Sequence, residues 1–160
     1  MKIGIVADTH SKDLPAAMMN AFKSVDFIIH AGDFCSSEDL QKFQKIKTVQ
    51  GVYGNMDDAQ IRQIFPRKQI LKLDNCTIGL FHGEGPPRTV LEKVKKEFSK
   101  DDVDCIVFGH SHIPVNETID GVLYFNPGSP NDLISAPSCS YGILEINQEK
   151  IRGTIVKVAS

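Results

Sequence analysis

The sequence predicts an α/β fold in which two β-sheets pack face to face and helices cover their outer surfaces. The first half of the chain alternates apolar segments of strand length with amphipathic helical segments, and the second half is richer in strands joined by tight turns. Strand–helix–strand alternation calls for parallel strands, because the crossover between them runs through a helix packed on the sheet. The tight turns call for antiparallel strands later in the chain.

The first half supplies three strands and two helices. The apolar strands are expected at residues 2–7, 26–30 and about 47–52. Between the first two lies a helix at 13–25, whose apolar face consists of Leu14, Met18, Ala21, Phe22 and Val25. A second helix should open at Ser36, with Asp39 in the capping-box position.

The second half begins with a short helix that stops at Pro66 and continues with seven strands. These strands are expected at 68–73, 76–81, 104–108, 113–119, 122–126, 140–146 and 150–157. Asp74-Asn75 and Asp120-Gly121 are tight-turn dipeptides that predict hairpins. Pro86-Pro87 opens a further helix, with an apolar stripe that ends at Phe98.

Composition excludes several classes of protein. With no internal repeat or linker, we expect a single domain over residues 1–160. The 18 basic and 20 acidic residues give a formal charge of −2, so nucleic acid and anionic lipid are not favoured as partners. No apolar run approaches the ~20 residues of a membrane span. Four cysteines without C-x-x-C spacing predict reduced thiols and a cytoplasmic location.

Acidic, histidine and amide side chains directly follow the expected strands. They occur in Asp8-Thr9-His10, Gly32-Asp33, Gly54-Asn55-Met56-Asp57, His82-Gly83 and Gly109-His110-Ser111-His112. Ligands gather beyond the carboxyl ends of strands in such sheets, so one shared site is expected. Carboxylate, amide and imidazole donors suit Mn²⁺, Fe, Co²⁺, Ni²⁺ or Zn²⁺. The motifs contain too many ligands for one tetrahedral ion and enough for two. Sites with two metal ions hydrolyse phosphate esters.

In this order, these motifs resemble the calcineurin-like metallophosphoesterase superfamily, in particular its small bacterial and archaeal phosphodiesterases. The resemblance implies an α/β, four-layer αββα sandwich of two mixed sheets with a dinuclear metal site, most often manganese. It also implies the division of the ligands. One metal would be held by Asp8, His10 and His112, the other by Asn55, His82 and His110, with Asp33 bridging both.

The expected function is therefore metal-dependent hydrolysis of a small-molecule phosphate ester, most often a diester. We expect Asn55, Asp57 and His82 to contribute most directly to catalysis. The alternative is a non-catalytic scaffold, since a retromer subunit of vacuolar sorting resembles the same fold. The complete ligand set favours the enzyme. An apolar edge near 113–126 could pair two copies into a homodimer.

Several positions carry separate expectations. Met56 stands where many relatives have a histidine that protonates the leaving oxygen, so that role is unassigned here. Asp57 either orients Asn55 or His10, or caps the helix at 58–65. His30 is expected to be a buried, hydrogen-bonded core residue. The segment Asn126-Pro127-Gly128-Ser129 forms a turn whose backbone could wall the cleft.

Overall fold

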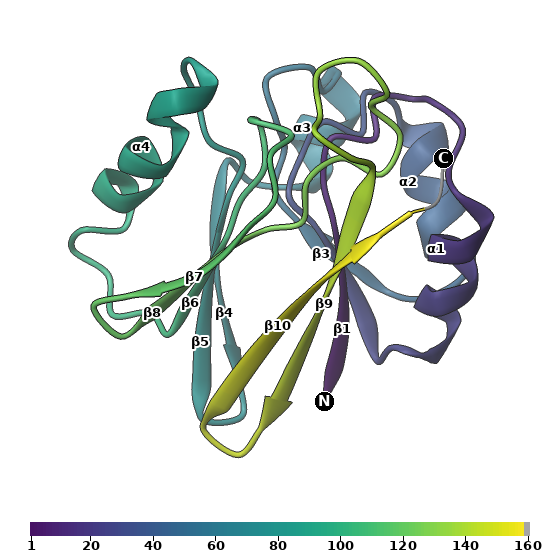
Figure 1. The fold of residues 1–160 in the computed structure, drawn as a ribbon. Helices are drawn as coiled ribbons and strands as arrows, with labels where there is room; N and C mark the ends of the chain where they lie inside the picture. Colours follow the sequence, from purple (N-terminus) through teal and green to yellow (C-terminus); the bar gives the residue numbers. More distant parts are fainter. Residues whose placement is uncertain (159–160) are drawn as a thin grey trace.

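A computed structural model describes residues 1–158 of the protein as four layers, with two β-sheets in the middle and helices on both outer faces (Figure 1). The first sheet has the order β10-β9-β1-β2-β3 and consists of β1 (Lys2–Val6), β2 (Phe27–His30), β3 (Val49–Gly51), β9 (Ser140–Asn147) and β10 (Lys150–Lys157). The second has the order β4-β5-β6-β8-β7 and consists of β4 (Lys68–Leu73), β5 (Cys76–Phe81), β6 (Cys105–Val107), β7 (Val115–Ile119) and β8 (Val122–Asn126).

Both sheets are mixed. In the first, β1, β2 and β3 are parallel, while β9 is antiparallel to β1 and to β10. In the second, β5, β6 and β8 are parallel, and the edge strands β4 and β7 are antiparallel to their neighbours. The predicted fold class is confirmed.

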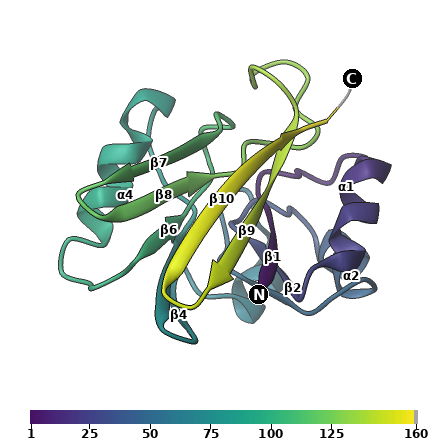
Figure 2. The same cartoon turned by 60° about the horizontal axis from the view of Figure 1, so that its bottom comes forward.

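Helices cover the two outer faces. The first sheet is covered by α1 (Ala16–Ala21) with a 3₁₀ turn at Phe22–Ser24, by α2 (Ser37–Gln44) and by α3 (Ala59–Ile64). The second is covered by α4 (Val90–Glu97), which follows a 3₁₀ turn at Pro87–Thr89. Figure 2 shows α4 and the pair α1 and α2 on opposite sides of the strands. Within residues 1–158, no helix is long and apolar enough to cross a membrane.

The two sheets meet in a buried apolar layer. Alternate residues of β1, such as Ile3 and Ile5, point into it, as does Phe125 of β8. The Phe125 ring lies directly on Gly142 and Gly153 of the opposite sheet, and a Cβ added to Gly153 would lie 2.6 Å from it. A glycine at each position lets the two sheets approach closely.

Two local expectations were wrong. Helix α1 begins at Ala16 rather than residue 13, because Pro15 lies in extended conformation at its N-cap. Ser36 is the N-cap of α2, but no capping box forms. Asp39 accepts hydrogen bonds from the hydroxyls of Ser36 and of Ser11, which lies in the loop after β1. Asp39 therefore ties α2 to that loop instead of capping the helix.

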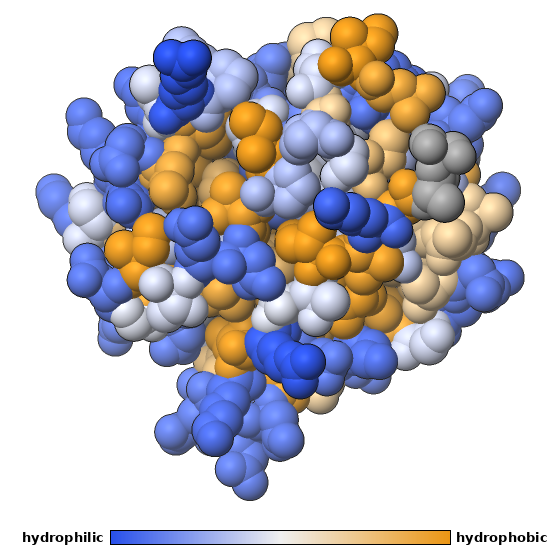
Figure 3. All heavy atoms as spheres, in the orientation of Figure 1, coloured by the Kyte–Doolittle hydropathy of each residue, from blue (hydrophilic) through white to orange (hydrophobic). Residues whose placement is uncertain are grey.

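The directions of the strands bring the loops that carry the candidate ligands to one edge of the molecule. The loops that follow β1, β2, β3, β5, β6 and β8 all emerge at the top of Figure 1. The loop between β8 and β9 also exposes Leu133 and Ile134 there, and Figure 3 shows apolar side chains over this part of the surface. Polar side chains that follow strands of both sheets are therefore brought together at this edge.

Candidate metal centre

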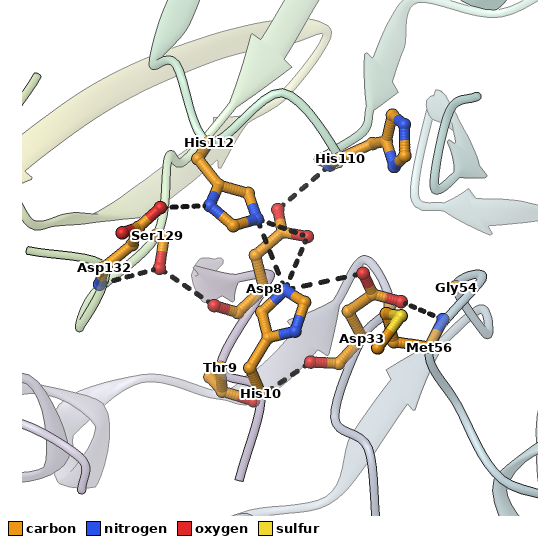
Figure 4. Close-up of polar contacts among 12 residues, drawn as sticks. Asp8, Thr9, His10, Asp33, Gly54, Met56, His110, His112, Ser129 and Asp132 are labelled. Atoms are coloured by element: carbon orange, nitrogen blue, oxygen red, sulfur yellow. Dashed lines mark hydrogen bonds and ion pairs between the residues drawn. The ribbon is translucent and has the colours of Figure 1, made fainter. Parts of the chain in front are cut away.

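The structure brings the seven candidate ligands together at the carboxyl ends of the strands. Figure 4 shows Asp8, His10, Asp33, His110 and His112 among them. Two groups have ligand atoms within 4.8 Å of one another, namely Asp8, His10 and His112, and Asp33, His82 and His110. Asn55 joins the second group, because its Oδ1 lies 3.1 Å from His110 Nδ1. Each group combines residues from both sheets.

One carboxylate oxygen of Asp8 is fully buried and has no hydrogen-bond partner within residues 1–158. The Nε2 atoms of His10, His82 and His112 surround this Oδ1 at 3.7, 3.7 and 3.5 Å. The other oxygen, Oδ2, accepts a bond of 2.9 Å from the His110 backbone N–H. A buried, unpaired carboxylate oxygen is costly unless a cation or donor meets it. Its surroundings fit a metal ion.

Asp33 lies between the two groups. Its Oδ2 is 3.5 Å from His10 Nε2 in the first group and 3.2 Å from His82 Nε2 in the second. Its Oδ1 accepts a hydrogen bond of 2.8 Å from the backbone N–H of Met56. One oxygen is thus fixed by the chain, and the other faces both groups.

Each candidate histidine has a partner at its remote ring nitrogen. The partners are Ala31 O for His82 at 2.7 Å, Gly85 O for His110 at 2.9 Å, Asp132 Oδ2 for His112 at 2.5 Å, and Cys35 Sγ for His10 at 3.7 Å. Such partners fix the tautomer of a metal-binding imidazole, so that the nitrogen facing the site carries a lone pair.

The facing nitrogens then approach one another in pairs. His10 Nε2 lies 3.3 Å from His112 Nε2, and His82 Nε2 lies 3.3 Å from His110 Nδ1. Two lone pairs at this distance repel unless a proton or a cation lies between them. Both pairs therefore fit a shared ion, one in each group.

The electrostatics of the site favour cations. Burial would raise the pKa of Asp8, but the imidazoles of His82, His10 and His112 hold it well below its usual range. Burial would lower the pKa of His82, but the carboxylates of Asp8 and Asp33 raise it to about 9. The carboxylates of Asp8 and Asp33 are therefore ionised at neutral pH, and they stabilise positive charge inside the buried site.

Backbone strain is concentrated at the same residues. Asp8, His10, Asp33, His110 and His112 all have positive φ values, between 49° and 70°. This left-handed conformation is uncommon outside glycine, and strain of this kind costs about 1–3 kcal/mol per residue. The turns direct side chains from separate strands towards one point.

Two motif glycines leave room for the carboxylates. A Cβ added to Gly54 would overlap the Asp33 carboxylate, and one added to Gly109 would lie 2.8 Å from Asp8 Oδ2. The glycines of the G-N and G-H motifs therefore allow the backbone to pass close behind these two acids.

Asp57 is not the cap of α3, and it acts on the candidate ligands through the backbone rather than through the Asn55 or His10 side chain. The N-cap of α3 is Asp58, whose Oδ1 accepts a hydrogen bond of 3.0 Å from Ile61 N. Asp57 instead accepts bonds from the backbone N–H groups of Asp33 at 2.9 Å, Gly54 at 2.7 Å and Cys35 at 2.7 Å. It fastens the loop after β2 to the loop after β3 and so positions the candidate ligands from behind.

Asp132 is a site residue that the sequence motifs did not indicate. It lies in the loop after β8 and is the partner of His112. The same loop braces the first group, because Ser129 Oγ donates to Asp8 O at 2.8 Å. Asn126, the last residue of β8, adds a bond of 3.1 Å from its Nδ2 to Gly109 O. The only sequence signal for Asp132 is an acid soon after a parallel strand.

His30 is a core residue, as predicted. It is fully buried, its Nε2 lies 3.1 Å from the Thr9 hydroxyl, and its Nδ1 accepts a bond from Gly32 N. Its ring stacks on Phe34 with the centroids 3.5 Å apart. Burial lowers the pKa of His30 to about 3, so it is neutral in the folded protein.

Known proteins share this fold and sequence pattern. The family model for the calcineurin-like phosphoesterase superfamily domain matches residues 1–149. A probable metallophosphoesterase of Methanothermobacter thermautotrophicus is 31% identical, over 100% of this chain and 94% of that protein. A solved structure described as a novel archaeal phosphodiesterase has 25% identity and a TM-score of 0.76, and covers 98% of this chain and 100% of its own.

A third similarity concerns the fold alone. Vps29 from Entamoeba histolytica, solved in complex with zinc, has 21% identity and a TM-score of 0.76 over 98% of this chain and 99% of its own. The family match and the archaeal relative reach further, because the family model matches residues 1–149 and the relative is 31% identical over the whole chain. The chain belongs to the calcineurin-like phosphoesterase superfamily.

Proposed function

We propose that the protein is a metal-dependent phosphodiesterase that hydrolyses small phosphate esters. The observation that carries the proposal is the buried Asp8 Oδ1, which has no hydrogen-bond partner in the described part of the chain and faces three imidazole nitrogens at 3.5–3.7 Å. Family membership supports hydrolysis of a phosphate ester, and the similarity to an archaeal phosphodiesterase supports a diester.

The proposed ligand division follows the two groups. Asp8, His10 and His112 would hold one ion, and Asn55, His82 and His110 the other. Asp33 would contact both, since its Oδ2 faces His10 and His82. When bound, two divalent ions would lower the pKa of a water and polarise the phosphate for in-line attack.

The chain's own residues fix the geometry of this chemistry. The remote partners of the four histidines hold each imidazole in one orientation, and Asp57 holds the loops that carry Asp33 and Asn55. Asn55 contributes a neutral oxygen, which leaves the ions more electrophilic than another carboxylate would. No protein nucleophile is needed, so we expect no covalent intermediate.

At position 56, this chain has no residue that can protonate the leaving group. The Met56 side chain is 56% exposed, and a thioether has no proton to give. We therefore propose that the enzyme prefers esters whose leaving oxygen departs without a proton, such as aryl esters.

The test is metal analysis of the purified protein together with hydrolysis of bis(p-nitrophenyl) phosphate before and after chelation. We expect about two divalent ions per chain, loss of activity with chelator, and recovery with Mn²⁺. Asp33→Asn should abolish turnover, whereas Asp26→Asn, at an exposed position remote from the groups, serves as the matched control. Activity that survives chelation, or that Asp33→Asn leaves intact, would contradict the metal-dependent mechanism, and no hydrolysis by the metal-loaded protein would favour the scaffold function instead.

Three further expectations belong to this proposal, namely manganese as the metal, a cytoplasmic location and a homodimer formed through the edge near residues 113–126, which contains β7. Strand β7 is an edge strand, but its Asn116 Nδ2 donates a bond of 2.9 Å to Gly153 O of β10. Metal analysis of protein purified without added metal and sedimentation measurements test the first and third.

A further inference from the structure

A pocket of about 240 Å³ lies beside the second ligand group. Asn55 and His82 line it, together with Arg62 of α3 and Arg67, which precedes β4. Pockets that enclose a whole drug-sized ligand measure about 300–1,000 Å³. This pocket therefore suits one part of a ligand whose other part reaches the candidate metal centre.

Arg62 brings a positive charge that no carboxylate neutralises. Its Nε donates to Asp57 O at 3.0 Å and its Nη2 to Asn55 O at 3.3 Å, and both acceptors are neutral carbonyls. Among residues 1–158, no carboxylate lies within 4.0 Å of it. A guanidinium has five N–H donors, so three remain for a ligand.

Arg67 is partly neutralised. It donates to both oxygens of Glu97, at 2.7 and 3.4 Å, and lies 4.0 Å from Glu84 Oε2. Of the two acids, Glu84 lines the pocket, and its side chain is 58% exposed. Glu97 offsets the charge of Arg67, so the positive charge without a close carboxylate at the pocket is that of Arg62.

Aromatic rings support both guanidinium groups. Arg62 lies 4.6 Å from the centroid of the Tyr53 ring, and Arg67 lies 4.6 Å from that of Phe81. Stacking restricts a guanidinium plane while leaving its edge donors available. Planar, restricted donors of this kind recognise phosphate oxygens in pairs.

We propose that Arg62 and Arg67 bind a second phosphate group of the substrate. The ester cleaved at the metal centre would then carry a further phosphate on the part that enters this pocket. The inference rests on the proposed phosphodiesterase function for the cleaved bond, but the binding of the second phosphate depends only on the two arginines.

The kinetic test uses two esters that differ only in this phosphate. They are thymidine 5′-(p-nitrophenyl phosphate) and the same ester with an added 3′-phosphate, and both release p-nitrophenolate. With Mn²⁺-loaded protein, we expect the 3′-phosphorylated ester to have a kcat/KM higher by about tenfold or more, as hydrogen bonds between charged groups provide. Equal values in the wild-type protein contradict the proposal without any variant.

Three variants and one control sharpen the test. Arg62→Gln and Arg67→Gln should each lower the ratio of the two kcat/KM values towards one. Glu84→Gln should raise the ratio, because it removes the competing carboxylate without removing any contact to the candidate ligands. Arg152→Gln removes the same charge from an exposed position on β10 and should leave the ratio unchanged.

A binding measurement separates this proposal from the hydrolase proposal. Thymidine 3′,5′-bisphosphate is titrated by calorimetry into chelator-treated protein, where no turnover is needed. We expect binding to weaken about tenfold in Arg62→Gln, to strengthen in Glu84→Gln and to be unchanged in Arg152→Gln. This result supports the phosphate pocket even if no ester is hydrolysed. Binding that responds to none of the pocket variants overturns it, and Glu84→Gln decides the matter if Arg62→Gln fails to fold.

Discussion

Replacement of Asp132 by asparagine tests whether a residue outside the sequence motifs holds a metal ligand in place. Asp132 Oδ2 lies 2.5 Å from His112 Nδ1, and its Oδ1 accepts bonds from the backbone of Ile134 and Ser135. Burial would raise the pKa of Asp132, but the bond with His112 and these N–H groups lower it to about 2. Asparagine keeps the shape and the acceptor but removes the charge.

The size of the effect follows from this bond. The Asp132 side chain is 7% exposed, so water screens the interaction little. A hydrogen bond to a charged group contributes about 1.5–3 kcal/mol and a neutral one about 1 kcal/mol. The difference of roughly 0.5–2 kcal/mol corresponds to about 2- to 30-fold weaker metal binding at the His112 group. Asp132→Ala removes the bond entirely and should cost about 10–100-fold.

Competition with a fluorescent chelator measures the two metal affinities in sequence. We expect Asp132→Asn and Asp132→Ala to weaken one of the two ions and to leave the other, at the His110 group, nearly unchanged. Asp120→Asn is the matched control, since Asp120 occupies an exposed turn with φ 50°, which asparagine also tolerates. Unchanged affinity in Asp132→Ala, or an equal loss at both positions, would refute the reasoning.

Three more predictions concern catalysis, pH and packing. Met56→His should speed hydrolysis of phenyl esters by about 10²-fold or more and p-nitrophenyl esters much less, because only the poor leaving group needs a proton; equal effects on both esters in steady-state assays would contradict this. In the unfolded chain, His30 takes up a proton as the pH falls below 6.5. In the native protein, His30 stays neutral until the pH approaches 3, because burial lowers its pKa to about 3. With chelator present, the free energy of unfolding should therefore decrease by up to about 1.4 kcal/mol per pH unit between pH 6.5 and pH 3. The slope should be flatter in His30→Gln. If urea denaturation gives the same pH dependence for both proteins, the prediction is wrong. Phe125→Ala should lower that free energy by about 3–5 kcal/mol in urea titrations, since the ring fills the space between the sheets, and a loss below 1 kcal/mol would be inconsistent with this packing.

The candidate ligands were predictable because each follows the end of a strand within a few residues. Asp8 and His10 come directly after β1, and His110 and His112 come directly after β6. Strand direction then places them at one edge regardless of how the loops are built in detail. The inward turns at these residues were not predictable, because positive φ at aspartate or histidine leaves no pattern in the sequence.

Asp57 and Asp132 show where sequence reasoning stops. Asp57 and Asp58 are both suitable caps for α3, and only the position of the loop after β2 decides that Asp57 turns inward. Asp132 meets His112 because the loop after β8 folds back over the first group, which is a tertiary contact. Local propensity also missed the late start of α1, where Pro15 outweighs an otherwise helical apolar pattern.

The position of β1 has a consequence for how the chain folds during synthesis. The strand pairs with β2 on one side and with β9 on the other, so Ile3 lies opposite Leu144. Strand β1 is thus completed by a strand that is synthesised much later, and contacts of such long sequence separation form slowly. Until Ser140–Asn147 is made, one edge of β1 has unpaired backbone groups that could pair with another chain. Chaperone protection of this edge during translation would therefore matter more for this protein than for one whose sheets are built from consecutive strands.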